Sequence, residues 1–313
     1  MTPAAESPVL GLTEWLLIGF LAFLWGGSFF FFAVAVHELP PMTVAFGRVA
    51  IGGVVLLALA LLTVRAPVTR RLLGAFLIMG LLNNAIPFTL TATAQMHIDS
   101  GLASILNGTT PIFSAILAVL VGQEAFAKRR LAGVVLGFLG VVVLLGPKTL
   151  ASGGGAGWSE LLVLGTALSY ACAGIFGRRA FQGVPPMLTA TGQVVGAALL
   201  LAPVALLVDR PWQLAGPSPQ AWGALVGIGL LCTALAYPIF FRVLRTAGAT
   251  NLMLVTLLNP VSALLLGILV LGERPHWTAF AGMALIFAGL LAMDGRVLDR
   301  LRPRPVSQNK PMR

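Results

Sequence analysis

The polar side chains that could bind a solute occur in short runs inside otherwise apolar stretches of the sequence. Three runs stand out: Asn83 and Asn84; Asn107, Thr109, Thr110 and Pro111; and Thr256, Asn259 and Pro260. Amides and hydroxyls donate and accept hydrogen bonds, and in hydrocarbon they are costly unless they face a cavity or another helix. As a set they predict one central binding site, although each side chain alone could instead bridge two helices or satisfy a broken turn.

Two prolines end these runs at matching depths. Pro111 and Pro260 each follow polar residues in an apolar stretch. A proline removes a helical hydrogen bond and frees a carbonyl. Such backbone is tolerated within a membrane only where protein or a wet cavity covers it. We therefore predict that Pro111 and Pro260 act as hinges beside the site.

Aromatic side chains with a polar group are the next candidates. Trp25, Tyr170 and Tyr237 lie near the centres of apolar stretches, whereas the other tryptophans lie near their ends. A buried indole N–H or phenol O–H needs a hydrogen-bond partner. We predict that these three residues line the site with Phe88. The alternative is core packing with a satisfied hydrogen bond.

Arg48 is the basic residue that lies well inside an apolar stretch. It is about 7.5 Å from the predicted outer end of its helix, at a rise of 1.5 Å per residue. One interpretation is a cation at the outer mouth that attracts a carboxylate or forms part of a gate. The other is a side chain that extends toward the outer headgroups.

The chemistry of the common enzyme classes is missing from the sequence. His37, His97 and His276 fall outside the apolar stretches and have no metal-binding spacing, and there is no Walker A loop. No carboxylate lies at the centre of a stretch to serve as a general acid or base. We therefore expect neither catalysis nor a metal or cofactor. A membrane enzyme with an unrecognised site and a structural subunit remain the alternatives from other classes.

The elements that must position these residues are membrane helices. Of the 313 residues, 58% are hydrophobic and 10% are charged, with a mean hydropathy of +0.95. Soluble domains carry about 25% charged residues. Long apolar stretches recur along the chain. They predict an all-α membrane protein with ten spans: 14–36, 43–64, 72–95, 100–121, 131–147, 158–180, 188–208, 221–243, 249–271 and 277–295.

The basic residues predict the orientation of these spans. With the N-terminus in the cytoplasm, most of the 20 Lys and Arg residues fall on the inner side, while Lys148, Arg210 and Arg274 fall outside. Cytoplasmic connections of membrane proteins carry such an excess. We therefore expect both termini to be cytoplasmic. The charge is explained without nucleic acid, and the basic tail 296–313 is expected to contact anionic lipid headgroups.

The sequence contains an internal repeat. An offset of about 149 residues aligns Pro111 with Pro260 and Glu124 with Glu273, and an offset of about 145 aligns Pro40-Pro41-Met42 with Pro185-Pro186-Met187. Each copy holds five spans, so the second must start on the opposite side of the membrane. Inverted repeats are common in secondary transporters, where two halves open a central site to alternate sides. A duplication kept only for packing is the alternative.

Taken together, these residues resemble a known family. The Trp25-Gly26-Gly27-Ser28-Phe29 run, Pro41 followed by Arg48, and the doubled proline-to-glutamate segments resemble EamA-type members of the drug/metabolite transporter superfamily. The resemblance covers residues 14–296 and implies ten helices, two inverted bundles and solute export. Amino-acid exporters, including exporters of aromatic amino acids, are among the similar members. The second half departs from the pattern at Gln193, which stands where the first half has Arg48.

The sequence thus predicts a bacterial inner- or plasma-membrane exporter of small amphipathic metabolites such as neutral or aromatic amino acids. Its expected parts are a tail 1–13, a first bundle 14–147, a second bundle 158–295 and the tail 296–313. Because no carboxylate or histidine lies mid-span, we expect facilitated efflux, with exchange or export of another metabolite or drug as alternatives. The partners are the solute and the bilayer, and the chain is a monomer or a weak dimer. The predicted binding residues are Trp25, Asn83, Asn84, Phe88, Asn107, Thr110, Tyr170, Tyr237, Thr256 and Asn259.

Overall fold

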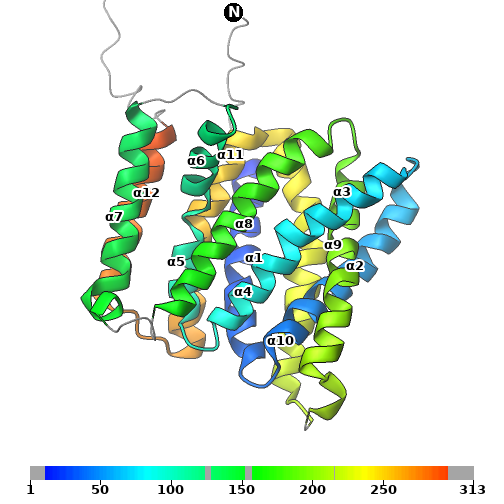
Figure 1. Ribbon diagram of the computed structural model, residues 1–313, viewed down its shortest axis with the longest axis horizontal. Coiled ribbons are helices and arrows are strands. Elements are labelled where there is room, and N and C mark those ends of the chain that lie inside the picture. The colour runs from blue at the N-terminus through cyan, green and yellow to red at the C-terminus, as the bar shows by residue number, and fades with distance from the viewer. Residues whose placement is uncertain (1–10, 124–127, 152–156, 215, 295–313) are drawn as a thin grey trace, which may run out of the picture.

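The computed structural model describes residues 11–123, 128–151, 157–214 and 216–294, and every regular element in these ranges is a helix (Figure 1). The all-helical class predicted from the sequence is therefore confirmed. Glu124, residues 1–10 of the N-terminal tail and the whole tail 296–313 lie outside the described residues. The main helices are α1 Leu12–Val36, α2 Pro41–Thr63, α3 Arg70–Gly80, α4 Ile86–Ala94, α5 Ser100–Asn107, α6 Thr110–Leu120, α7 Lys128–Ala151, α8 Trp158–Ala180, α9 Pro186–Val204, α10 Pro219–Gly229, α11 Ala236–Leu266 and α12 Trp277–Asp294.

Eight helical segments are long and apolar enough to cross a membrane. They are Leu12–Val36, Pro41–Thr63, Arg70–Ala94, Ser100–Leu120, Trp158–Ala180, Pro186–Gln213, Pro219–Gly248 and Leu254–Leu271. Two shorter apolar helices, Leu131–Gly146 and Trp277–Met293, lie where the fifth and tenth spans are predicted. The arrangement is that of a helical membrane protein.

Short π-helical segments interrupt two of the spans at corresponding places. The segment η1, Leu81–Ala85, follows Gly80, and η4, Leu230–Leu235, follows Gly229 at the 149-residue offset. Pro87 and Pro238 come shortly after these segments. A proline has no N–H to donate four residues back. One carbonyl in each π segment therefore lacks its α-helical donor. Single-turn π segments of this kind often occur at functional sites.

Helix α1 is central to the packing. It contributes buried side chains to three apolar clusters, one shared with α2, α9 and α10, one with α5, α7 and α12, and one with α11. In Figure 1 the pair α7 and α12 lies on one side, and α2, α3 and α9 lie on the other. The elements that carry most of the predicted binding residues, α1, α4, α8 and α11, lie between these two groups.

Helices α7 and α12 pack through glycines in a reciprocal pattern. A Cβ on Gly133 would lie 2.6 Å from the carbonyl oxygen of Gly289, and one on Gly140 would lie 2.8 Å from that of Gly282. The converse contacts have the same lengths. In the repeat, Gly282 is the counterpart of Gly133 and Gly289 is the counterpart of Gly140. Gly133 therefore packs against the counterpart of Gly140, and Gly140 packs against the counterpart of Gly133. This is the pattern that a local two-fold axis produces, and it shows glycines serving close packing within one chain.

Three carboxylates cap helix starts across the two halves. Asp209 accepts hydrogen bonds from the backbone N–H (2.6 Å) and hydroxyl (2.9 Å) of Thr43 in the first turn of α2. Glu38 accepts from the backbone N–H and hydroxyl of Ser218, both at 2.6 Å, at the start of α10. These bonds satisfy helix-terminal donors and place negative charge at the positive end of the helix. The Ser218 bonds lower the pKa of Glu38.

The third carboxylate, Glu273, accepts from the backbone N–H groups of Ser100 (2.8 Å) and Gly101 (3.2 Å) at the start of α5. Partial burial, with the nearby Glu273 charge, raises the pKa of Asp99. The connections that carry these caps all lie at the lower end of Figure 1, away from the N-terminus. The two halves are therefore tied together at one end of the helices.

Candidate functional site

Arg48 occupies a buried position among four helical elements. It lies on α2 and its side chain is 5% exposed. The Nε group donates to the hydroxyl of Thr233 in η4 (3.2 Å), and Nη1 donates to the hydroxyl of Ser28 in α1 (2.8 Å). This burial speaks against a side chain that extends to the headgroups. The two hydrogen bonds of Arg48 join η4 in the second half to α1 and α2 in the first half.

Two phenylalanine rings complete the surroundings of the guanidinium. Its central carbon lies 3.7 Å from the ring centroid of Phe88 and 5.2 Å from that of Phe32. Both distances fall within the range of a cation–π interaction, which strengthens when water is excluded. The ring centroids of Phe32 and Phe88 are 6.2 Å apart. The positive charge is thus held against aromatic faces and two neutral hydroxyls.

A second set of polar contacts involves Asn83 and Asn84 in η1. Asn83 donates from its amide to the side-chain oxygen of Gln193 on α9 (2.9 Å). The Asn84 amide and the Tyr237 hydroxyl are 3.4 Å apart. Asn84 is fully buried and Tyr237 is 9% exposed. These contacts also join the two halves, because Gln193 and Tyr237 belong to the second half.

The structure therefore brings together five of the predicted residues: Arg48, Asn83, Asn84, Phe88 and Tyr237. Tyr170 packs against the same buried cluster and lies within electrostatic range of Arg48. We call this set, with Ser28, Gln193 and Thr233, the interhalf cluster. Sequence reasoning did not single out Ser28 or Thr233 as site residues. Their signal was a polar side chain inside an apolar span, the same signal that identified the asparagines.

Trp25 and Asn259 belong to the crossing of α1 with α11. The rings of Trp25 and Phe240 have centroids 5.4 Å apart. In the amide orientation that satisfies both groups, Asn259 donates to the carbonyls of Val255 (2.9 Å) and Ala22 (3.3 Å). Thr256, one turn before Asn259, is half-buried. Among the described residues, no hydrogen bond joins these side chains to the interhalf cluster.

The polar run before Pro111 lies where α5 ends and α6 begins. The hydroxyl of Thr109 donates to the carbonyl of Leu106 (2.6 Å), and that of Thr110 donates to the carbonyl of Asn107 (2.8 Å). These bonds satisfy the broken turn, as the alternative interpretation expects. The side-chain oxygen of Asn107 is buried and accepts no hydrogen bond from the described part of the chain. It is the polar atom of this run that can still accept a hydrogen bond from a solute.

The two prolines differ in their local structure. Pro111 lies in the first turn of α6, just after the break at Gly108 and Thr109. Pro260 lies inside α11, and the helix continues past it to Leu266. The non-helical residue of α11 is Gly248, with φ 80° and ψ 164°. Gly248 lies at the turn between the spans Pro219–Gly248 and Leu254–Leu271, about twelve residues before Pro260.

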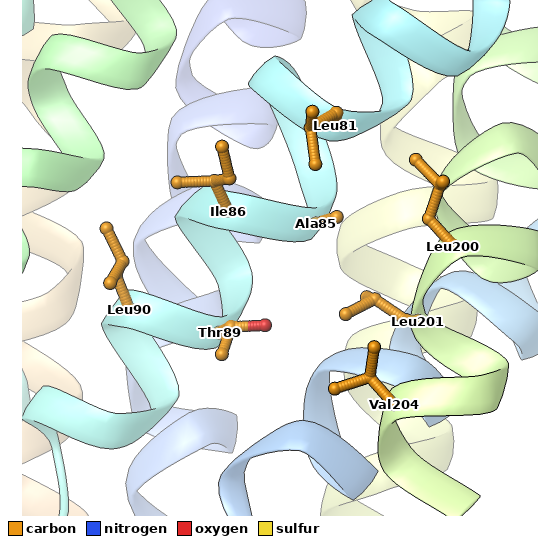
Figure 2. Close-up of a pocket in the computed structure, with 8 residues that line it drawn as sticks. All are labelled: Leu81, Ala85, Ile86, Thr89, Leu90, Leu200, Leu201 and Val204. Atoms are coloured by element: carbon orange, nitrogen blue, oxygen red, sulfur yellow. The ribbon is translucent and has the colours of Figure 1, made fainter.

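An apolar groove of about 250 Å³ lies on a different face of η1 and α4 (Figure 2). It is lined by aliphatic residues of η1, α4 and α9, with Thr89 as its polar member. The Thr89 hydroxyl is buried and has no hydrogen-bond partner among the described residues. None of the predicted binding residues lines this groove. In the described ranges, no three His, Cys, Asp or Glu side chains gather in a group that could hold a metal ion.

Comparison with known families gives two matches to one family. The EamA-like transporter family matches residues 13–146 and, separately, residues 157–293. The two matched segments together cover most of the chain.

Individual relatives align over nearly their whole length. The chain is 28% identical to the uncharacterized inner membrane transporter YedA of Escherichia coli (92% of this chain, 94% of the relative). It is 27% identical to the uncharacterized transporter YoaV of Bacillus subtilis (85% and 91%). It is 28% identical to a probable amino-acid metabolite efflux pump of Salmonella typhimurium (87% and 93%). A solved crystal structure shares the fold, with a TM-score of 0.63 and 22% identity over 91% of this chain and 96% of the other.

Proposed function

This chain belongs to the EamA-like transporter family, and we propose that it exports small amphipathic metabolites, with neutral or aromatic amino acids as its solutes. The observation that carries the proposal is the interhalf cluster, in which amides, hydroxyls and one cation lie among aromatic rings. A site that mixes apolar faces with a few oriented polar groups suits a solute with a polar head and an apolar side chain. The name of the Salmonella relative supports the same solute class.

The architecture we propose is ten transmembrane helices in two inverted bundles, 14–147 and 158–295. The two separate family matches support this division. The corresponding π segments and the reciprocal glycines of α7 and α12 support a two-fold relation between the halves. The bias of basic residues supports cytoplasmic termini, and an E. coli relative named as an inner membrane transporter supports that membrane. We propose that one chain suffices for transport, as a monomer.

The solute site we propose lies between the bundles. Its lining is drawn from Trp25, Asn83, Asn84, Phe88, Asn107, Thr110, Tyr170, Tyr237, Thr256 and Asn259. The described contacts support the members of the interhalf cluster most directly. The free oxygen of Asn107 supports its inclusion, whereas the hydroxyl of Thr110 is already used by a local carbonyl.

Transport proceeds by alternating access in this proposal. The carboxylate caps of Glu38, Asp209 and Glu273 hold the outer end closed, since each joins one half to the other. Opening outward requires these caps to separate while the halves rock about the break before Pro111 and about Pro260 in α11. Because no carboxylate or histidine lies at a span centre, the solute moves down its own gradient without a proton carrier.

The test is solute flux through purified full-length protein in liposomes. We expect preloaded phenylalanine and leucine to leave the liposomes faster than from protein-free vesicles, and unlabelled solute to compete. A pH gradient alone, with equal solute on both sides and the potential clamped, should drive no accumulation. Absence of flux for every amino acid tested would overturn the solute class. Uphill accumulation abolished by a protonophore would overturn the uncoupled mechanism.

A further inference from the structure

Among the side chains that the structure describes, Arg48 has no partner of opposite charge. Among the side chains whose burial the structure describes, Arg48 is the one buried basic residue, and Glu160, in the first turn of α8, is the one buried acid. No ion pair joins the two among those residues. Removing an ion from water is strongly unfavourable unless a counter-charge and hydrogen bonds replace the water. Two neutral hydroxyls and a cation–π contact offset this cost only partly.

From this we propose that Arg48 is the binding point for the carboxylate of the transported solute. The inference rests on the proposed function, in that it takes a small solute to enter the space between the halves. It specifies the solute as a monocarboxylate and names the side chain that recognises it. The solute then supplies the counter-charge that the protein lacks.

The donor geometry of the guanidinium fits this role. Nε and Nη1 donate to Thr233 and Ser28, and Nη2 donates to no described residue. An arginine presents its N–H groups in a planar fork that matches the two oxygens of a carboxylate. A hydroxyl can both donate and accept. Ser28 can therefore turn from accepting an arginine proton to donating to a carboxylate bound beside it, whereas the Thr233 hydroxyl already donates to the carbonyl of Ile228 (3.2 Å).

The surroundings favour a monoanion with an apolar part. A phosphate dianion would bring a second negative charge, and the buried part of the described chain holds no second cation to balance it. Phe32, Phe88, Tyr170 and Tyr237 lie near the charge and offer aromatic faces to a side chain. The expected solute therefore has one carboxylate next to an apolar or aromatic group.

The same contacts connect binding to the movement of the halves. Ser28 belongs to the first half and Thr233 to the second, and Arg48 now holds both. A carboxylate that takes over the N–H groups of Arg48 weakens the Arg48–Thr233 contact across the halves. Solute binding thus favours separation of α2 from η4. An empty site keeps them together, which limits opening without solute.

The experiment compares phenylalanine with phenylalanine amide, which differ at the carboxylate alone, in liposomes containing the full-length protein. We expect wild-type protein to transport phenylalanine better by about tenfold or more, the size of a charged hydrogen bond. Arg48→Gln should remove this preference, so that the ratio of phenylalanine flux to amide flux falls to about one. The substitution suits the site because Gln193 fills the corresponding position in the second half. Arg48→Lys keeps the charge and should retain part of the preference.

Gln193→Ala is the matched control, because it removes a polar contact of the same cluster without removing a charge. It should lower both fluxes in proportion and keep their ratio. Equal flux of the two solutes through wild-type protein, or an equal loss of both in Arg48→Gln, would overturn the carboxylate proposal and leave transport standing. If Arg48→Gln does not fold, a reduced preference in Arg48→Lys supports the proposal, and an unchanged preference overturns it. Absence of flux for both solutes and for every amino acid tested would overturn the proposed function itself.

Discussion

The two halves of the chain build the same frame around different chemistry. Arg48 in α2 and Gln193 in α9 correspond at the 145-residue offset. Arg48 contacts η4 of the second half, and Gln193 contacts η1 of the first half. Phe88 and Tyr237 correspond at the 149-residue offset. The first half thus places a cation and a phenyl ring at positions where the second half places a neutral amide and a phenol.

The shared frame depends on two glycines that precede the π segments. A Cβ on Gly80 would lie 2.6 Å from the carbonyl oxygen of Gln193, and one on Gly229 would lie 3.3 Å from that of Arg48. Gly80 approaches the main chain of α9, and Gly229 approaches the main chain of its counterpart α2. These approaches therefore do not depend on whether the side chain is Gln193 or Arg48. The comparison teaches that a duplicated frame can keep its packing while one copy acquires a charge. Four changes test how far the two copies differ.

The largest expected effect is that of Gln193→Arg, which places a second cation at the corresponding site. The second half has Gly177 and Ala173 at the positions of Phe32 and Ser28, so neither the Phe32 ring nor the Ser28 hydroxyl is repeated. An uncompensated buried charge destabilises a fold by about 3–5 kcal/mol. We expect loss of folded protein in size-exclusion chromatography. Gln193→Met is the matched uncharged control, and equal stability of both variants would show that the halves are chemically equivalent.

The second effect separates the two glycines. Gly80→Ala forces a Cβ to 2.6 Å from both the nitrogen of Ala197 and the carbonyl oxygen of Gln193. The nearest atoms to a Cβ on Gly229 belong instead to the side chain of Ile51. Overpacking costs about 1–3 kcal/mol, and side chains adjust more readily than main chain. Thermal unfolding should therefore show Gly80→Ala to be the more destabilising substitution. The reverse order would contradict the described approach of Gly80, at the end of α3, to α9.

The third effect measures the aromatic support of the cation. Phe88→Leu should cost more than Phe32→Leu, because the guanidinium is 3.7 Å from the first ring and 5.2 Å from the second. The expected difference is about 0.5–1 kcal/mol, within the range of cation–π energies. Repeating both substitutions in Arg48→Gln protein gives a double-mutant cycle. The difference should disappear there, and its persistence would attribute it to packing alone.

The smallest effect concerns the start of α5, where Asp99 corresponds to Gly248 of the second half. Burial and the charge of Glu273 raise the pKa of Asp99, so the folded state holds this proton more tightly than the unfolded chain. Stability from this group therefore grows as the pH falls from above the raised pKa toward the ordinary value, and is lost as the pH rises. Asp99→Asn should flatten this dependence and slightly stabilise the protein at neutral pH. A pH series of unfolding temperatures checks it, and an unchanged slope would contradict the Asp99–Glu273 coupling.

Local sequence patterns were sufficient for the secondary structure and for part of the candidate site. Apolar length predicted helical spans close to those observed, because a membrane helix satisfies its own backbone and needs no distant partner. The polar pair Asn83 and Asn84 and the lone cation Arg48 stood out because polar groups are rare in such spans. Pro260 shows the limit of this reasoning. The helix continues past Pro260 to Leu266, and Gly248, the non-helical residue of α11, lies at the turn between the predicted spans 221–243 and 249–271.

The sequence by itself determined the helical class, the membrane setting and the residues too polar to lie there without a reason. Only the tertiary structure decided which of them meet. Asn83 finds Gln193 at a separation of 110 residues, and Arg48 finds Thr233 at 185. Thr109 and Thr110 instead bond their own turn. The physical reason is that burial and polarity are properties of a local segment, whereas a hydrogen-bond partner is set by the packing of helices from both halves. That packing brings Arg48 against two rings and two hydroxyls, with no counter-charge among the described side chains.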